Sequence, residues 1–135
     1  MKKMCSTKMK KCNNVAFWFE ISVNDLVRAK KFYEAVFDLK LSTHKMGPME
    51  MEFFPFEKGS AGASGALVKC KGYTPSHQGS VVYFSVDDIE STLAKVKKHG
   101  GGVLVPKTDI GEYGFFATFE DSEGNRVALH TQKNC

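Results

Sequence analysis

Two side chains in this sequence, a carboxylate and an imidazole, could take part in acid–base chemistry or metal binding. Glu20 lies in a strand-like segment near the start of the chain, and His130 lies in another near its end. If both project into one apolar cleft, they could act as general base and acid, or as two ligands of a metal site that a water or Glu52 completes. They could also anchor a ligand without chemistry, or simply hydrogen-bond each other or the nearby backbone.

An internal repeat indicates how distant residues could meet. Residues 19–26 (FEISVNDL) recur as residues 82–89 (VYFSVDDI), and an amphipathic segment follows in both copies. A unit of about 60 residues buries too little surface to be stable alone, so two copies of one supersecondary unit should pack together. We therefore expect the functional site at the seam between the halves.

Each half of the sequence predicts the order βαβββ. Strand-like segments are expected at residues 15–23, 39–45, 49–56, 66–70, 80–86, 103–106, 114–119 and 126–131. A first helix is expected at about residues 25–38 with Asn24 as its N-cap, and a second is expected after Asp87, ending at the glycine run 100–102. A turn is expected at Gly47 and Pro48. These patterns predict an α+β fold.

Composition limits the class of protein. The 135 residues, 42% hydrophobic and 25% charged, fit one compact domain, which we place at residues 15–135 after a flexible basic tail at 1–14. Five of the 19 Lys and Arg residues lie in that tail, so the net charge of +4 does not predict a nucleic-acid surface. The four cysteines form no C-x-x-C pair and are expected to be reduced. With no membrane span or secretory signal in the sequence, we expect a cytoplasmic protein.

The repeat and two local motifs resemble a known superfamily. Residues 19–37 (FEISVNDLVRAKKFYEAVF) and 119–131 (FEDSEGNRVALHT) are similar to the vicinal oxygen chelate superfamily, which includes glyoxalase I, bleomycin-resistance proteins and extradiol dioxygenases. The resemblance implies two tandem βαβββ modules, at 15–72 and 79–132, that form an open, cup-shaped, eight-stranded mixed sheet with helices on its outer face. It also implies a homodimer, and a divalent metal held at four strand positions.

The four positions at which the resemblance implies metal ligands carry apolar side chains. They are Trp18, Ala66, Val81 and Ala128. Such side chains offer no lone pairs to a divalent ion, so we expect no metal and no other cofactor. Residues two positions along a strand share its face, so Glu20 and His130 should then point into the cup.

The resemblance places Trp18 where a metal ligand would stand, and we expect Phe54 and Tyr83 near it. This arrangement predicts an aromatic pocket in which the indole ring of Trp18 forms the floor. We therefore favour a protein that binds a small hydrophobic or aromatic molecule without a metal, and that has no nucleic-acid or membrane partner. The alternative is a lyase, isomerase or dioxygenase-type enzyme that acts on a small carbonyl or aromatic metabolite through Glu20 and His130, with or without a metal at shifted positions.

Overall fold

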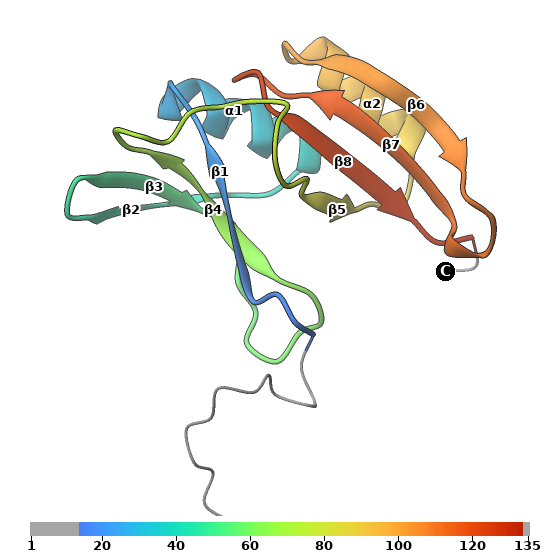
Figure 1. Cartoon of the computed structure of the whole chain (residues 1–135), viewed down its shortest axis with the longest axis horizontal. Helices are drawn as coiled ribbons and strands as arrows, with labels where there is room; N and C mark the ends of the chain where they lie inside the picture. The colour runs from blue at the N-terminus through green and yellow to red at the C-terminus, as the bar shows by residue number, and fades with distance from the viewer. Residues whose placement is uncertain (1–13, 134–135) are drawn as a thin grey trace, which may run out of the picture.

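The computed structural model describes residues 14–133, so nearly all of the predicted basic tail lies outside the described residues. The first half of the chain forms β1 (Trp18–Ser22), α1 (Leu26–Phe37), β2 (Ser42–Met46), β3 (Met49–Phe53) and β4 (Ser64–Lys69). The second half forms β5 (Tyr83–Ser85), α2 (Ile89–Lys98), β6 (Gly102–Asp109), the short 3-10 helix η1 (Gly111–Tyr113), β7 (Phe115–Glu120) and β8 (Arg126–Thr131). The predicted α+β class with two tandem βαβββ modules is confirmed (Figure 1).

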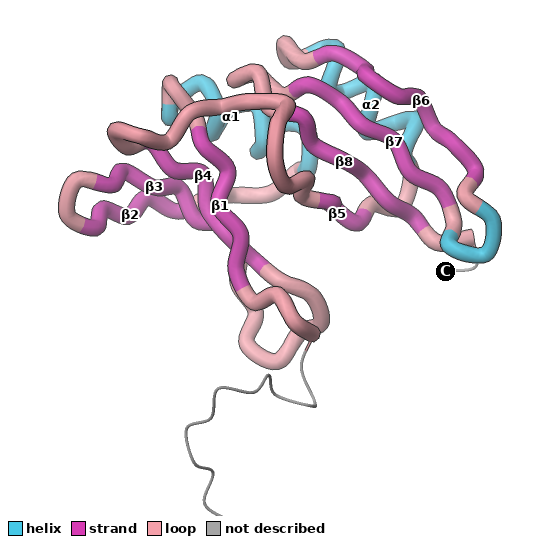
Figure 2. The backbone as a smooth tube through the Cα atoms, viewed as in Figure 1, coloured by secondary structure: helices cyan, strands magenta, loops and turns pink. Residues whose placement is uncertain are grey.

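The strands divide between two four-stranded mixed sheets. Sheet A has the order β1-β4-β3-β2 and sheet B the order β5-β8-β7-β6 (Figure 2). In each sheet the first strand of the module runs parallel to the last, while the other pairs are antiparallel. We expected one eight-stranded sheet, but no described strand of sheet A pairs with sheet B. The modules meet instead through side chains, among them Phe19 and Phe84, whose rings lie 5.7 Å apart.

One hydrophobic core joins the two modules on the face of the sheets that the helices cover. It contains Phe32, Tyr33, Phe54, Leu67, Val96, Phe119 and Leu129, all nearly or fully buried. A second cluster of Met51, Ala66 and Val68 lies on the opposite face of sheet A, against Trp18 and Phe53. We call this opposite face, which the helices do not cover, the cup face. Because a strand with two buried faces lacks a polar side, β4 is apolar from Gly65 to Val68.

Both helices begin one residue later than predicted. The N-caps are Asp25 and Asp88, whose side chains accept hydrogen bonds from the backbone amides of Arg28 and Ser91 at 3.0 and 3.1 Å. An N-cap must be extended and must reach the amide three residues on, and Asp25 meets both conditions. None of the described helices is long and apolar enough to cross a membrane.

The turn between β7 and β8 is built around a buried carboxylate. Asp121 is 3% exposed and accepts hydrogen bonds from the Tyr33 hydroxyl at 2.6 Å and from the backbone amides of Glu123 and Asn125. Burial, together with the nearby charge of Asp121, raises the pKa of Tyr33 well above its ordinary value, so the phenol remains a donor. The contact ties the turn of module two to α1 of module one.

Glu123, in the same turn, binds the start of α1. Its carboxylate accepts hydrogen bonds from the backbone amides of Asn24 and Asp25, each at 2.9 Å, and from both the Nε and Nη2 of Arg28 at 2.7 and 3.0 Å. Burial acts to raise the pKa of Glu123, but these hydrogen bonds outweigh it and the pKa is lowered. We call residues 121–125 the clamp turn, because it locks one module onto the other.

Candidate ligand-binding site

The candidate site begins with the aromatic side chains of the cup face of sheet A. Alternation along β1 directs Phe19 and Ile21 to the helices and Trp18 to the cup face. The Trp18 indole is partly exposed and meets the Phe53 ring edge to face, with centroids 5.1 Å apart. Phe53 in turn stacks on the imidazole of His44 at 4.0 Å. These three rings form a continuous aromatic surface, open to solvent.

A carboxylate stands beside this surface. Glu20 is exposed on the cup face, two residues from Trp18, and lies close enough to the Tyr73 hydroxyl to interact with it electrostatically. The negative charge of Glu20, and to a lesser degree burial, raises the pKa of Tyr73. No Lys, Arg or His in the described residues forms an ion pair with Glu20. Its charge is therefore available to a ligand.

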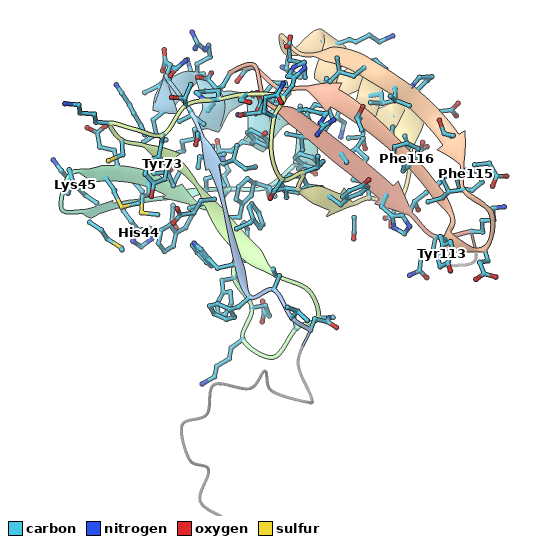
Figure 3. All side chains as sticks on the ribbon, in the orientation of Figure 1. His44, Lys45, Tyr73, Tyr113, Phe115 and Phe116 are labelled. Carbon is cyan, nitrogen blue, oxygen red and sulfur yellow. The ribbon has the colours of Figure 1, made fainter. Side chains whose placement is uncertain are left out.

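The cup face of sheet B carries His130 and Tyr83. The His130 ring donates from Nε2 to the backbone oxygen of Tyr113 at 2.6 Å, which ties β8 to η1. Tyr83 is 56% exposed and lies opposite Ala128 on the neighbouring strand. Figure 3 shows the labelled Tyr113 on this module, far from Tyr73 and His44 on module one.

The structure does not bring Glu20 and His130 together. The Glu20 carboxylate lies near Tyr73 in module one, whereas the His130 imidazole forms a hydrogen bond with the backbone of Tyr113 in module two. No contact among the described residues joins the two side chains. Acid and base catalysis by the pair on one small molecule would require a movement of the modules or a ligand that spans both.

Two residues that we expected to line the cup point toward the helices instead. The Glu52 carboxylate accepts a hydrogen bond from the Thr43 hydroxyl at 2.7 Å and lies 3.5 Å from the ammonium of Lys30 on α1. Phe54 is 5% exposed and belongs to the shared core. The cause is strand alternation on β3, which gives the cup face to Met51 and Phe53, so our placement of Glu52 and Phe54 in the cup was wrong.

The side chains at the four positions where we expected metal ligands do not fit a divalent ion. Ala66 and Ala128 are fully buried, opposite Glu20 and Tyr83 in the strand registers, and Trp18 is packed against Phe53. None of these side chains has an oxygen or imidazole nitrogen to donate. In residues 14–133, no three His, Cys, Asp or Glu side chains are close enough to hold a metal ion together.

A cavity of about 630 Å³ lies where the end of α1 in module one meets module two. It is bounded by the end of α1 at Phe37, by the start of α2 at Asp88 and Ser91, and by His130 and Thr131 at the end of β8. His130 thus reaches a cavity, although not the one expected around Trp18. A smaller cavity of about 330 Å³ lies on module one, beside Cys70 and Tyr73.

Sequence reasoning missed three residues of the site, which are His44, Phe53 and Tyr73. Phe53 could have been found from the alternation of residues 49–54, in which Met49, Met51 and Phe53 share a face. Tyr73 lies in the connection between the modules, where no periodic pattern indicates the direction of a side chain. Only the folded chain places it against Glu20.

Comparison with known proteins identifies the class. The family model for the Glyoxalase/Bleomycin resistance protein/Dioxygenase superfamily matches residues 16–129, and the chain belongs to this superfamily. CFP32 of Mycobacterium tuberculosis, which carries a glyoxylase name, is 32% identical over 107 residues. That match covers 79% of this chain but only 40% of CFP32, so the chain spans less than half of this relative. A glyoxylase-like domain-containing protein of Didymella fabae is 31% identical over 84% of this chain and 90% of its own length.

Solved structures share the fold. A glyoxalase/bleomycin resistance protein from Albidiferax ferrireducens T118 matches 88% of this chain and 99% of its own, with a TM-score of 0.64 and 18% identity. A glyoxylase/bleomycin resistance protein/dioxygenase domain from Frankia sp. EAN1pec matches 90% of this chain and 98% of its own, with a TM-score of 0.69 and 16% identity. At these identities the likeness concerns the fold alone.

Proposed function

We propose that this protein binds a small apolar or aromatic molecule on its cup face without the divalent metal of its superfamily. The observation that carries the proposal is the surface of Trp18, Phe53 and His44, in which Trp18 occupies a position where the resemblance implies a metal ligand. Ring stacking and edge contacts between aromatic groups contribute about 0.5 to 1.5 kcal/mol beyond buried area. An open aromatic surface therefore suits a flat ligand.

The proposal is tested by Trp18 fluorescence, because this is the only tryptophan in the chain. We expect 4-nitrophenol, as a flat aromatic probe, to quench the emission with a saturable curve. Changing Phe53 to Ala should weaken binding about tenfold, since it removes the ring that packs on the indole. The matched control is Phe56→Ala, which removes a ring that contacts Phe17 rather than Trp18. A linear quench like that of free tryptophan would contradict the proposal.

A second candidate is an enzyme that moves a proton on a small carbonyl or aromatic compound. The closeness of Glu20 and Tyr73 favours it, because a carboxylate can accept a proton as a general base, while a phenol with a raised pKa stays protonated and can donate a hydrogen bond to a substrate oxygen. If this holds, Glu20→Gln will abolish turnover of an adduct between a thiol and a 2-oxoaldehyde and leave the quenching of Trp18 intact. The exposed Glu90 on α2 provides the control, Glu90→Gln, which should change neither.

We also propose a homodimer. Large apolar side chains are exposed at one end of module one, with Val15, Phe17 and Phe56 at 77%, 69% and 53%. The outer strand β2 is exposed along its whole length, and an uncovered sheet edge is commonly protected by pairing. Sedimentation velocity at micromolar concentration should give the mass of two chains, and a clean monomer would contradict this proposal.

A further inference from the structure

The β2–β3 hairpin carries three of the six methionines of the chain within six residues, at 46, 49 and 51. Met46 and Met49 flank the predicted two-residue turn, in which Gly47 has a φ of 58°, and they are directly opposite in the register of the hairpin. Opposite residues of an antiparallel pair share a face, with Cβ atoms about 5 Å apart. The two thioethers therefore lie side by side on the cup face.

A thiol continues this row of sulfur atoms. β3 pairs with β4 up to Glu50 and Lys69, so one further step in the same register places Cys70 opposite Met49. Both residues pack against the cluster around Met51 on the cup face. Cys70 is a free, partly exposed thiol that borders the cavity of about 330 Å³ next to Pro48, so the row is accessible from solvent. In Figure 3 sulfur atoms, in yellow, gather at this end of sheet A, near the labelled His44 and Tyr73.

An imidazole lies in the next row. His44 is opposite Met51 in the register, and its stacking on Phe53 holds the ring against the cup face. Its Nε2 contacts the Ser42 hydroxyl at 3.2 Å, and among the described residues its Nδ1 has no hydrogen-bond partner. The hairpin thus presents thioether, thiol and imidazole donors on one face.

Core packing explains only part of this arrangement. Methionine fills gaps in cores, and Met51, which is 1% exposed, does so here. Met46, by contrast, is 55% exposed and fills no gap. A role in metal binding explains better why an exposed thioether lies next to a second thioether and a thiol.

We propose that Met46, Met49 and Cys70, with His44 beside them, form a binding site for a monovalent soft metal ion, Cu(I). Thioether and thiolate ligands select Cu(I), whereas Zn(II) and Mn(II) prefer imidazole, carboxylate or multiple thiolates. Charge favours the same ion. One thiolate neutralises one monovalent cation while the thioethers add no charge, and the Cys70 proton is released to solvent on binding. The site is separate from the four superfamily positions. It shares His44 with the aromatic surface of the proposed function, but Cu(I) binding is measured independently of the quenching of Trp18.

The test is Cu(I) binding under anaerobic, reducing conditions, measured by competition with a coloured Cu(I) chelator. Because residues 1–13 also contain Met and Cys, the reference protein is the full-length chain with Met4→Leu, Met9→Leu, Cys5→Ser and Cys12→Ser. We expect this reference to retain about one equivalent of Cu(I) and no Zn(II). Adding Met46→Leu, Met49→Leu and Cys70→Ser should abolish retention, since Leu keeps the volume of Met but lacks its sulfur.

Two further variants and one spectroscopic measurement keep the result interpretable. Met46→Leu alone, at an exposed position that cannot unfold the protein, should weaken Cu(I) binding. His99→Ala, an exposed histidine of module two, should leave binding unchanged. X-ray absorption at the copper edge should give sulfur neighbours. A reference protein that retains no Cu(I), a triple variant that still binds it, or a copper surrounded only by nitrogen and oxygen would each overturn the proposal.

Discussion

The two modules share their order of elements but differ in the connection between their last two strands. In module two the clamp turn, residues 121–125, grips the β1–α1 junction of module one through Asp121 and Glu123. In module one the corresponding residues 54–63 bond within their own module, for example between the amide of Ser60 and the oxygen of Glu57. No hydrogen bond of the described chain runs from this loop to module two.

The first turns of α1 and α2 differ in the same way. Arg28 on α1 forms two hydrogen bonds with the clamp turn, whereas Ser91 at the matching position of α2 bonds only to its own N-cap residue, Asp88. Next to Ser91 lies the cavity of about 630 Å³. One clamp therefore holds the modules together, and the absence of a second leaves a hollow at the start of α2. The difference separates an end of the module interface that is closed by hydrogen bonds from an end that is left open.

The largest expected effect follows from removing the buried carboxylate of the clamp. Asp121→Ala should lower the free energy of unfolding by about 3 kcal/mol, because it leaves the Tyr33 hydroxyl and two backbone amides buried without acceptors. Equilibrium unfolding in urea measures this loss of unfolding free energy. The matched change in the module-one loop, Glu57→Ala, is at an exposed position and should alter stability by less than about 0.5 kcal/mol. Equal effects would erase the contrast between the modules.

A smaller loss is expected at the helix positions that correspond between modules. Arg28→Ala removes two charge-assisted hydrogen bonds to Glu123 and should lower the urea midpoint less than Asp121→Ala does, since half of the arginine side chain is in solvent. Ser91→Ala in α2 should cost only a few tenths, about 0.5 kcal/mol at most. If the serine change proved as costly, the asymmetry between the first turns of α1 and α2 would be contradicted.

The clamp should also make stability depend on pH. The pKa of Glu123 is lowered from its ordinary value of 4.5, so its contribution is fully present above that pH and is lost as the pH falls through the lowered folded value. The urea midpoint of the wild type should therefore fall more steeply below pH 4.5 than that of Glu123→Gln. Parallel curves would mean that the carboxylate charge does not hold the clamp.

The smallest effect concerns the site rather than the clamp. The charge of Glu20 raises the pKa of Tyr73, so Glu20→Gln should bring the titration of this phenol back toward its ordinary value of 10.0. Ring resonances followed by NMR against pH, assigned with Tyr73→Phe, would measure the change. An unmoved Tyr73 titration would show that the two groups do not interact in solution.

Much of the fold was predictable because periodic patterns report it directly. The repeat of residues 19–26 at 82–89 and the strand and helix spacing predicted both βαβββ modules. The division into two sheets was not predictable, since it depends on aromatic packing between modules, as between Phe19 and Phe84. The role of the clamp turn was also hidden. Its residues were recognised as a superfamily motif, but nothing in the sequence says that Glu123 reaches Arg28.

The candidate site was less predictable than the fold. Trp18 lies on the cup face as expected. Adjacent residues of a strand point to opposite faces, so an error of one position along β3 exchanges the two faces. For this reason Phe53, and not Phe54, packs against Trp18. Glu20 and His130 belong to strands of different sheets, and their separation depends on how the modules pack. Local patterns carry no information about that packing.

The most direct test of the central claim is elemental analysis of protein purified without chelator or affinity metal, after incubation with excess zinc, nickel, manganese and iron(II) and desalting. Because the four superfamily positions lack ligand atoms, we predict less than about a tenth of an equivalent of any divalent metal per chain. A stoichiometric divalent metal that is lost on changing Glu20 or His130 to Ala would contradict the account. It would mean that the two modules come together around a metal at shifted positions.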